Sequence, residues 1–233
     1  FEDQPVFAEK TVLYRGEAVA AIVGNSSAVD TFDENDFPIS WQPHEAILTP
    51  EAAMKSSSRL LHKERKGNIL VRGYVACGDA QDALDRATYR VKIHTSTPFI
   101  EHAYIEPEAG YAICEDDRLV IYGCTQAPQM DRESLAKIMA MDIDVIRVVP
   151  SACGGGFGSK LDLSFQPFVA LAAWKLGRPV KICYGRGESM RSSTKRHPSE
   201  IRLEVGCDGQ GHISGFVFDG VFNTGAYASW GPT

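Results

Sequence analysis

The sequence lacks the features that mark membrane-spanning, secreted and nucleic-acid-binding proteins. It has no apolar segment that approaches the roughly 20 residues needed to span a bilayer. Its N-terminus, Phe1-Glu2-Asp3-Gln4, has neither the basic start nor the apolar stretch of a signal peptide. The net charge is −6, and a short basic run at residues 63–66 is interrupted by Glu64. We therefore expect no nucleic acid and no membrane among the partners, and we expect a cytoplasmic location.

The sequence also lacks a pairing pattern among its cysteines. No two of the six form a Cys-x-x-Cys motif. Cys114 and Cys183 stand in apolar, strand-like runs, so we expect buried free thiols in a reducing compartment. An iron–sulfur cluster needs grouped thiolates, and no flavin module is recognisable. We therefore expect neither an iron–sulfur cluster nor FAD in this chain.

Strand-like and helix-like patterns alternate along the 233 residues, a length that predicts one or two domains. Apolar runs and alternations predict strands at residues 12–14, 18–23, 37–41, 68–76, 89–94, 111–114, 118–124, 145–150, 180–184, 201–205 and 213–222. Helical periodicity after capping residues predicts helices at residues 27–34, 49–54, 80–87, 131–141 and 164–176. The predicted caps of the first four are Ser27, Thr49, Asp79 and Asp131. Turn residues predict hairpins around residues 115–117 and 207–211. This order predicts an α+β (mixed α/β) fold of mixed sheets and helices.

The run Cys153-Gly154-Gly155-Gly156-Phe157-Gly158-Ser159-Lys160 is unusual in composition and lies between a predicted strand and a predicted helix. Glycine permits positive φ and close approach of another molecule, so the run can present main-chain N–H groups to an anion. It is not a G-x-x-x-x-G-K-[ST] phosphate loop, because Leu161 follows the lysine, and no correctly spaced acidic residue completes a dinucleotide motif. The alternative is a tight strand-to-helix connection that binds no ligand.

Further short segments occur with this run in a fixed order, namely YRGEAVA (14–20), EHAYIEP (101–107), TQAP (125–128), GGGFGSK (154–160), RHP (196–198) and NTGAY (223–227). Together they resemble the molybdenum hydroxylases, the xanthine dehydrogenase and aldehyde oxidase family. The resemblance covers nearly the whole chain. It implies an α/β hammerhead domain over residues 1–62, incomplete at its N-terminus, followed by the first part of a molybdopterin-binding domain over residues 63–233.

The resemblance also implies site residues. Gln126 matches a glutamine whose neutral amide hydrogen-bonds an oxygen on molybdenum, so we expect it to serve both catalysis and cofactor binding. Gly156, Phe157 and Gly158 match main-chain contacts beside the metal and its dithiolene. Leu161 stands where xanthine-type members carry a purine-binding glutamate, so we expect it in the pocket of a less polar substrate. No side chain of this chain is expected to ligate the metal.

Structural roles are the alternative for several polar and aromatic residues. Lys160 is expected in an ion pair or in solvent. His102 and Glu106 are expected to form a hydrogen-bonded pair instead of a metal site, because no second histidine is near. Taken alone, Gln126 favours a strand-end residue in solvent or a cap of the helix that follows it, and only its occurrence with the glycine run reverses that preference. Phe157 is also compatible with an anchor that packs into the core.

The family's general base is a glutamate, which we expect on a segment or partner chain beyond Thr233. The chain would then share a molybdopterin–molybdenum cofactor with the remaining molybdopterin-binding domain or subunit, and would be inactive alone. A small molecule would be the substrate, hydroxylated with water as oxygen source, and iron–sulfur and FAD subunits or domains would take the electrons. Two alternatives stay open. One is a non-catalytic binding or assembly module, and the other is a phosphate-binding enzyme, against which the missing Ser or Thr after Lys160 counts.

Overall fold

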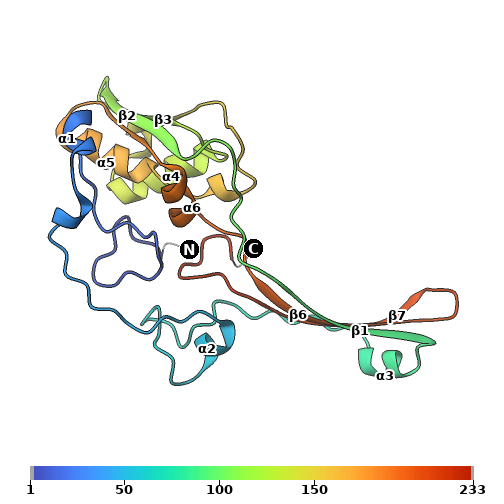
Figure 1. Cartoon of the computed structure of the whole chain (residues 1–233). Helices are drawn as coiled ribbons and strands as arrows, with labels where there is room; N and C mark the ends of the chain where they lie inside the picture. The colour runs from blue at the N-terminus through green and yellow to red at the C-terminus, as the bar shows by residue number, and fades with distance from the viewer. Residues whose placement is uncertain (1–2, 232–233) are drawn as a thin grey trace. The chain divides into compact units, whose positions relative to one another are not determined.

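The computed structural model describes residues 3–231, which divide into two compact units. The loop-bearing unit consists of residues 3–44 and 101–195, and the long-sheet unit consists of residues 45–100 and 196–231. Each combines helices with a sheet (Figure 1), which confirms the mixed α+β class. Within residues 3–231, no helix has both the length and the apolar character that crossing a bilayer requires.

The loop-bearing unit is built on a sheet with strand order β4-β3-β2-β5, in which β3 and β4 run parallel and the other neighbours run antiparallel. Its strands are β2 (Ala109–Glu115), β3 (Arg118–Gly123), β4 (Ile146–Pro150) and β5 (Val180–Cys183). Its helices and 3-10 turns are α1 (Ser26–Asp30), η1 (Glu34–Asp36), α4 (Pro128–Met139), η2 (Ile143–Val145), η3 (Ser159–Leu161), α5 (Gln166–Leu176) and α6 (Arg186–Ser192).

The core of this unit lies where α4 and α5 pack on the sheet (Figure 1). Its most buried members include Ala112, Leu119, Ile121, Leu135, Ile146, Phe165 and Val169. Gly110 and Gly123 pair across β2 and β3 and make room for the Phe165 ring, because a Cβ at either position would lie 2.2 or 2.3 Å from that ring. Burying each large apolar side chain contributes roughly 1.5–3 kcal/mol.

Local sequence signals explain where several of these elements turn or end. The β2–β3 hairpin turns at Asp116 and Asp117, whose φ angles of 49° and 60° are ones that Asp tolerates better than most residues. Helix α5 ends at Gly177, which adopts the left-handed conformation with φ 61°. The predicted hairpin and the predicted helix end are thus confirmed.

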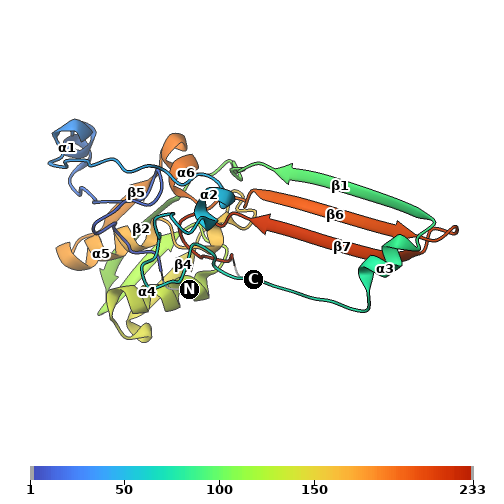
Figure 2. The same ribbon diagram turned by 90° about the horizontal axis from the view of Figure 1, so that it is seen from below.

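The long-sheet unit contains the antiparallel sheet β1-β6-β7, whose strands lie side by side in Figure 2. Its elements are α2 (Pro50–Met54), α3 (Ala80–Asp85), β1 (Tyr89–Thr97), β6 (Ser199–Cys207) and β7 (Ile213–Phe222). The caps predicted for its helices, Thr49 and Asp79, accept N–H groups of the first turns. Helix α3 packs on the sheet through Leu84, which is buried against Gly206 and Gly215.

Four predicted strands are wrong, at residues 12–14, 18–23, 37–41 and 68–76, which form no strand. The apolar residues of the last run lie in solvent, with Tyr74 91% and Val75 96% exposed. An apolar run becomes a strand only when neighbouring strands pair with it, and these runs have no such neighbour among the described residues. The predicted strand at 89–94 exists, but it is exposed along its whole length instead of half-buried.

Three further expectations need correction. The helix expected from Asp131 begins at Pro128, because the fixed φ of proline suits the first helical position, and Asp131 is buried in the first turn. Helix α1 is capped by Asn25 instead of Ser27, and α6 occupies a segment with no predicted helix. All six cysteines are free thiols, but Cys114 and Cys183, which lie near strand ends, are exposed.

Candidate functional site

The parallel pairing of β3 and β4 brings Gln126 beside the glycine-rich run, called here the glycine loop (residues 153–160). The last residue of β3, Gly123, pairs with the last residue of β4, Pro150. Gln126 follows β3 closely and the glycine loop follows β4. Both segments therefore leave the sheet at the same edge, and this is the structural reason that residues more than 30 positions apart meet.

The side-chain amide of Gln126 is fixed against the glycine loop. Its Oε1 accepts hydrogen bonds from the main-chain N–H groups of Gly158, at 3.0 Å, and Lys160, at 3.3 Å. Its own main-chain N–H donates to the Lys160 carbonyl at 2.9 Å. With Oε1 occupied, the amide NH₂ group points its donors away from these N–H groups, and it makes no hydrogen bond within residues 3–231. The side chain is exposed, so these donors are accessible to a ligand.

Two features of the loop require glycine: the close approach of its main chain to neighbouring side chains, and a positive φ angle. A Cβ on Gly156 would lie 2.3 Å from Gln126 Oε1, and a Cβ on Gly154 would lie 2.6 Å from the Cβ of Glu106. Gly158 adopts φ 94° with open space where a side chain would stand. The chain therefore passes close to two side chains and then turns through a region that other residues rarely adopt.

Consecutive N–H groups at the tip of the glycine loop are free to donate. The N–H groups of Gly155, Gly156 and Phe157 form no hydrogen bond within the described part of the chain, whereas those of Gly154 and Gly158 do. Such a run of main-chain donors is suited to an anionic or strongly polar ligand.

Phe157 does not anchor the loop in the core, contrary to one expectation from the sequence. Its ring is 73% exposed, and its φ of 51° is uncommon for a residue with a side chain. Leu161 ends the short turn η3 directly after Lys160 and is half-buried. The structure thus brings Gln126 together with Gly156 and Gly158, and it places Phe157 in the same loop with its side chain in solvent.

The expected ion pair of Lys160 is confirmed, and its partner is Glu106. Lys160 Nζ lies 2.8 Å from Glu106 Oε2 and 2.9 Å from the Glu106 carbonyl oxygen. Burial alone would raise the pKa of Glu106, but the hydrogen bonds from Lys160 and from the Gly154 N–H outweigh it and hold this pKa below its ordinary value.

Glu106 therefore does not pair with His102, and that expectation from the sequence is wrong. His102 Nδ1 is buried and has no hydrogen-bond partner in the described residues. No local pattern distinguishes Glu106 from the nearby Glu101 and Glu108, so the sequence alone could not identify the carboxylate that contacts the glycine loop.

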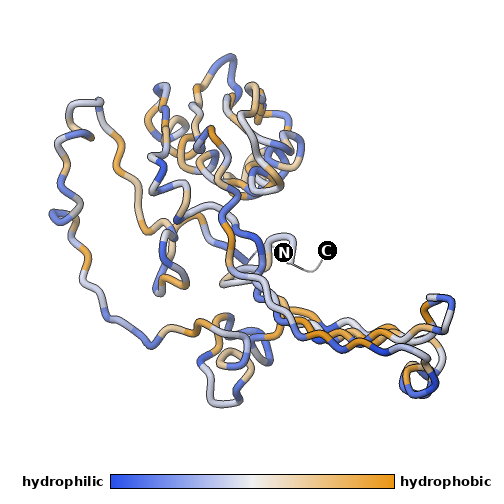
Figure 3. Tube along the Cα trace, turned by 45° about the vertical axis from the view of Figure 1, so that its right-hand side comes forward, coloured by the Kyte–Doolittle hydropathy of each residue, from blue (hydrophilic) through white to orange (hydrophobic). Residues whose placement is uncertain are grey.

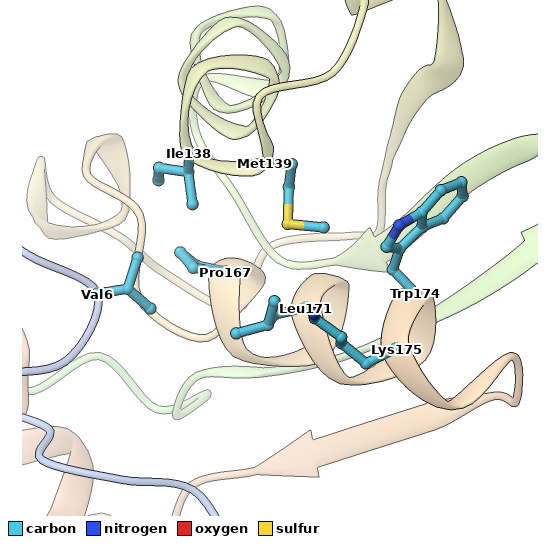
Figure 4. A pocket seen from close by; sticks show the side chains of 7 residues that line it. All are labelled: Val6, Ile138, Met139, Pro167, Leu171, Trp174 and Lys175. Atoms are coloured by element: carbon cyan, nitrogen blue, oxygen red, sulfur yellow. The ribbon is translucent and has the colours of Figure 1, made fainter.

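A concave region of the loop-bearing unit is lined by none of these residues. It is an open pocket of about 450 Å³ lined by Val6, two residues of α4 and four residues of α5 (Figure 4). Lys175 is the one ionisable side chain in this lining, so the pocket lacks the paired groups that acid–base catalysis commonly uses. Among residues 3–231, no three His, Cys, Asp or Glu side chains gather in a way that could hold a metal ion.

Comparison with known families gives one match over most of the chain. A family model described as the molybdopterin cofactor-binding domain matches residues 61–233. The "Xanthine dehydrogenase molybdenum-binding subunit" of Escherichia coli O157:H7 is 33% identical over 222 residues, which cover 94% of this chain and 29% of that protein. The "Nicotinate dehydrogenase large molybdopterin subunit" of Eubacterium barkeri is 31% identical over 99% of this chain and 54% of its own length.

A solved structure agrees with these relatives. Quinoline 2-oxidoreductase from Pseudomonas putida 86 superposes with a TM-score of 0.87 at 25% identity, over 96% of this chain and 29% of that chain. The chain thus spans between 29% and 54% of the length of the curated relatives named above.

Proposed function

This chain belongs to the molybdopterin cofactor-binding domain family, and from that premise we propose that it is part of a molybdenum-cofactor oxidoreductase that hydroxylates an aldehyde or an N-heterocycle with water as the oxygen source. The matches to xanthine dehydrogenase and molybdopterin-subunit relatives confirm the family that the sequence motifs resemble. The division into a hammerhead domain over residues 1–62 and a molybdopterin-binding part over residues 63–233 stays a prediction.

The observation that carries this proposal is the contact between the Gln126 amide and the glycine loop. Two main-chain N–H groups hold the amide oxygen, so the NH₂ group is presented in a fixed direction. A neutral donor held in this way can bind an oxygen atom of a cofactor without competing as an anionic ligand. A glutamine that merely ended a strand in solvent would not need its oxygen held twice.

The residues present fit a molybdopterin–molybdenum group. The free N–H groups of Gly155, Gly156 and Phe157 are donors for an oxygen-rich or sulfur-rich ligand. The open space beside Gly158 permits close approach of a ligand to the main chain. These donors, together with the NH₂ of Gln126, give a neutral, hydrogen-bonding surface suited to an anionic cofactor.

When bound, the molybdenum cofactor supplies the hydroxylation chemistry and takes two electrons from the substrate. In our proposal Gln126 orients the cofactor, Gly156, Phe157 and Gly158 bind it through the main chain, and Leu161 lines the substrate pocket. The apolar side chain of Leu161 favours an aldehyde or a weakly polar heterocycle over a purine. The cofactor would be shared with the remaining molybdopterin-binding domain or subunit, and iron–sulfur and FAD subunits or domains would accept the electrons.

Purification of the chain with its stably bound partners tests this proposal. We expect molybdenum and pterin in about equal amounts with the chain in the assembly, together with dye reduction driven by benzaldehyde or quinoline. The isolated 233-residue chain should contain neither in stoichiometric amount. A stable assembly that contains no molybdenum would contradict the enzyme proposal and favour the non-catalytic module.

Substituting Gln126 tests the residue that carries the proposal. Removing one positioned hydrogen-bond donor from an active site typically costs roughly 100-fold or more in turnover, so we expect Gln126→Ala to lose about that factor per bound molybdenum. Gln129→Ala is the matched control, because Gln129 is an exposed glutamine of α4 that bonds only to Glu133 among the described residues. Equal turnover in both variants would contradict the role of Gln126.

A further inference from the structure

The carboxylate of Glu106 holds both ends of the glycine loop. Glu106 Oε2 accepts the main-chain N–H of Gly154 at 2.8 Å and the ammonium of Lys160 at 2.8 Å. Gly154 and Lys160 bracket the stretch that contains the free N–H groups. One carboxylate oxygen therefore closes the loop at its base, while its tip remains unbonded.

Lys160 links this carboxylate to Gln126. Its side chain is 3% exposed and bonds to Glu106, whereas its main chain bonds to Gln126 through both the N–H and the carbonyl. The ammonium also lies 4.5 Å from the centre of the Tyr104 ring, which favours the charged form. A movement of the Lys160 side chain would therefore move the main-chain atoms that hold the Gln126 amide.

The segment that carries Glu106 is itself anchored. The Tyr104 hydroxyl donates to the buried carboxylate of Glu108. The Arg186 guanidinium donates to the carbonyl oxygens of Tyr104, at 2.7 Å, and Ile105, at 2.5 Å. Glu106 thus extends from a fixed segment, which is what a group needs to position a loop.

We infer that Glu106 and Lys160 are positioning residues that set the direction of the Gln126 amide and the shape of the glycine loop. This inference rests on the proposed function, since Gln126 and the loop are the cofactor-facing groups. Neither residue needs to touch the cofactor. The chemistry of their action is a charge-assisted hydrogen bond, which is shorter and stronger than a neutral one.

Hydrogen–deuterium exchange of the purified assembly, resolved to single amides by mass spectrometry, tests the positioning itself. In Glu106→Gln we expect the Gly158 and Lys160 amides to exchange about 10-fold faster, since the loss of a charged hydrogen bond changes an equilibrium by about that factor or more. Glu106 touches neither amide, so a purely local role would speed exchange at Gly154 alone. Unchanged exchange at Gly158 and Lys160 would overturn the inference.

Two further variants, Lys160→Met and the double variant Glu106→Gln/Lys160→Met, separate positioning from stability. Glu106→Gln leaves the buried ammonium of Lys160 without its partner, and a buried unpaired charge destabilises the fold. Lys160→Met leaves the Glu106 carboxylate unpaired, but that side chain is 32% exposed, so we expect a smaller loss of stability. The double variant Glu106→Gln/Lys160→Met removes both charges, so its melting temperature should recover relative to the single variants. Exchange at Gly158 should nevertheless stay fast. Recovery of slow exchange together with the melting temperature would overturn the inference.

The control is Asp144→Asn, which breaks the ion pair of Asp144 with Arg132 at 3.1 Å in the same unit. It should leave exchange in the glycine loop unchanged. Turnover per bound molybdenum should fall about 10-fold in Glu106→Gln and stay constant in the control. Absence of molybdenum from the wild-type assembly would count against the proposed function and leave the exchange result to decide the positioning role by itself.

Discussion

At the scale of single residues, Gly156 is a position where adding a single methyl group should strongly disturb the site. Alanine would place a methyl group 2.3 Å from Gln126 Oε1, so the amide must leave its two N–H partners. We expect Gly156→Ala to lower turnover per bound molybdenum by at least about 10-fold and to cost about 1–3 kcal/mol of unfolding free energy through overpacking.

Gly209→Ala is the matched control for that substitution. Gly209 lies in the β6–β7 turn, has no positive φ, and would have nothing within 4 Å of an added Cβ. Turnover and urea unfolding of both variants provide the measurement. A Gly156→Ala enzyme as active as Gly209→Ala would show that the close contact does not restrict Gln126.

Asp131 gives a second residue-level prediction, on pH dependence. The side chain is 1% exposed, and burial raises its pKa from 3.8 to about 6, although Gln166 donates a hydrogen bond to it at 3.3 Å. The folded state therefore binds the proton more tightly than the unfolded state does. The contribution of the protonated Asp131 side chain to folding stability is complete below pH 3.8 and is lost as the pH rises through about 6.

Asp131→Asn should remove this pH dependence, since an amide keeps an acceptor for Gln166 and does not ionise. The rise in pKa from 3.8 to about 6 corresponds to roughly 3 kcal/mol at most. We expect the variant to exceed the wild type in unfolding free energy by up to that amount at pH 7.5 and to match it near pH 4. Urea unfolding at both pH values tests this, and a constant difference between the two proteins would contradict it.

At the scale of elements, the sequence correctly predicts the helices and hairpins whose ends are marked by local Pro, Gly or Asp residues. Helix α5 is bounded by Pro167 and Gly177, and the β2–β3 hairpin by Asp116 and Asp117, so local residues fix their limits. The run at 68–76 has strand-forming residues but no neighbouring strand to pair with in the described residues. Whether such a run pairs depends on distant segments, which a local pattern cannot report.

In the candidate site, too, some contacts follow from local sequence patterns and others depend on residues far apart in the sequence. Gln126 and the glycine loop follow two apolar strands, and their convergence requires only that those strands be parallel neighbours. The Glu106–Lys160 pair joins residues 54 positions apart, and nothing local tells a buried charge from a solvated one. The roles assigned to Gln126, Phe157 and Leu161 stay predictions, because they concern contacts with a cofactor and a substrate.

Helix α3 provides a prediction about one element. Leu84 is 1% exposed, and Gly206 and Gly215 leave the space on the sheet that it fills. Leu84→Ala should cost about 2–5 kcal/mol locally, and because the helix spans only six residues we expect α3 to detach before the sheet unfolds. Hydrogen–deuterium exchange measures this, and we expect faster exchange confined to the amides of α3.

Gln81→Ala is the control for α3, because Gln81 is exposed on the same helix and bonds only to Asp85 within the described residues. It should leave exchange in α3 within a few-fold of the wild type. If Leu84→Ala instead accelerated exchange equally in β6, α3 and the sheet would unfold as one cooperative unit.

At the scale of the whole molecule, the chain enters each compact unit more than once. The long-sheet unit takes residues from both sides of the segment 101–195, so its sheet joins strands far apart in sequence, as in the pairing of β1 with β6. Compact units defined by spatial contacts and domains defined by sequence families can have different boundaries. The predicted boundary after residue 62 therefore stays a prediction.

The two faces of the long sheet differ in polarity. The register aligns Val91 with Val205 and Phe216, so that their side chains share one face. The opposite face carries charge pairs such as Arg90 with Glu204 and also receives α3. Figure 3 shows hydrophobic residues interspersed with hydrophilic ones along these strands, as two unlike faces require. Contiguous exposed apolar surface of this kind is unusual on a soluble monomer.

This apolar face leads to the last prediction, that the isolated chain binds a hydrophobic dye through it. Val91, Ile93 and Phe218 are 56%, 44% and 50% exposed, which leaves their side chains accessible to 1-anilinonaphthalene-8-sulfonate. The double variant Ile93→Thr/Phe218→Thr keeps strand-compatible residues and should reduce dye fluorescence at least about 2-fold, because both residues face the same side. Lys92→Thr changes the opposite face and should leave the fluorescence unchanged. Equal fluorescence in the two variants would place the dye elsewhere and contradict an accessible apolar face.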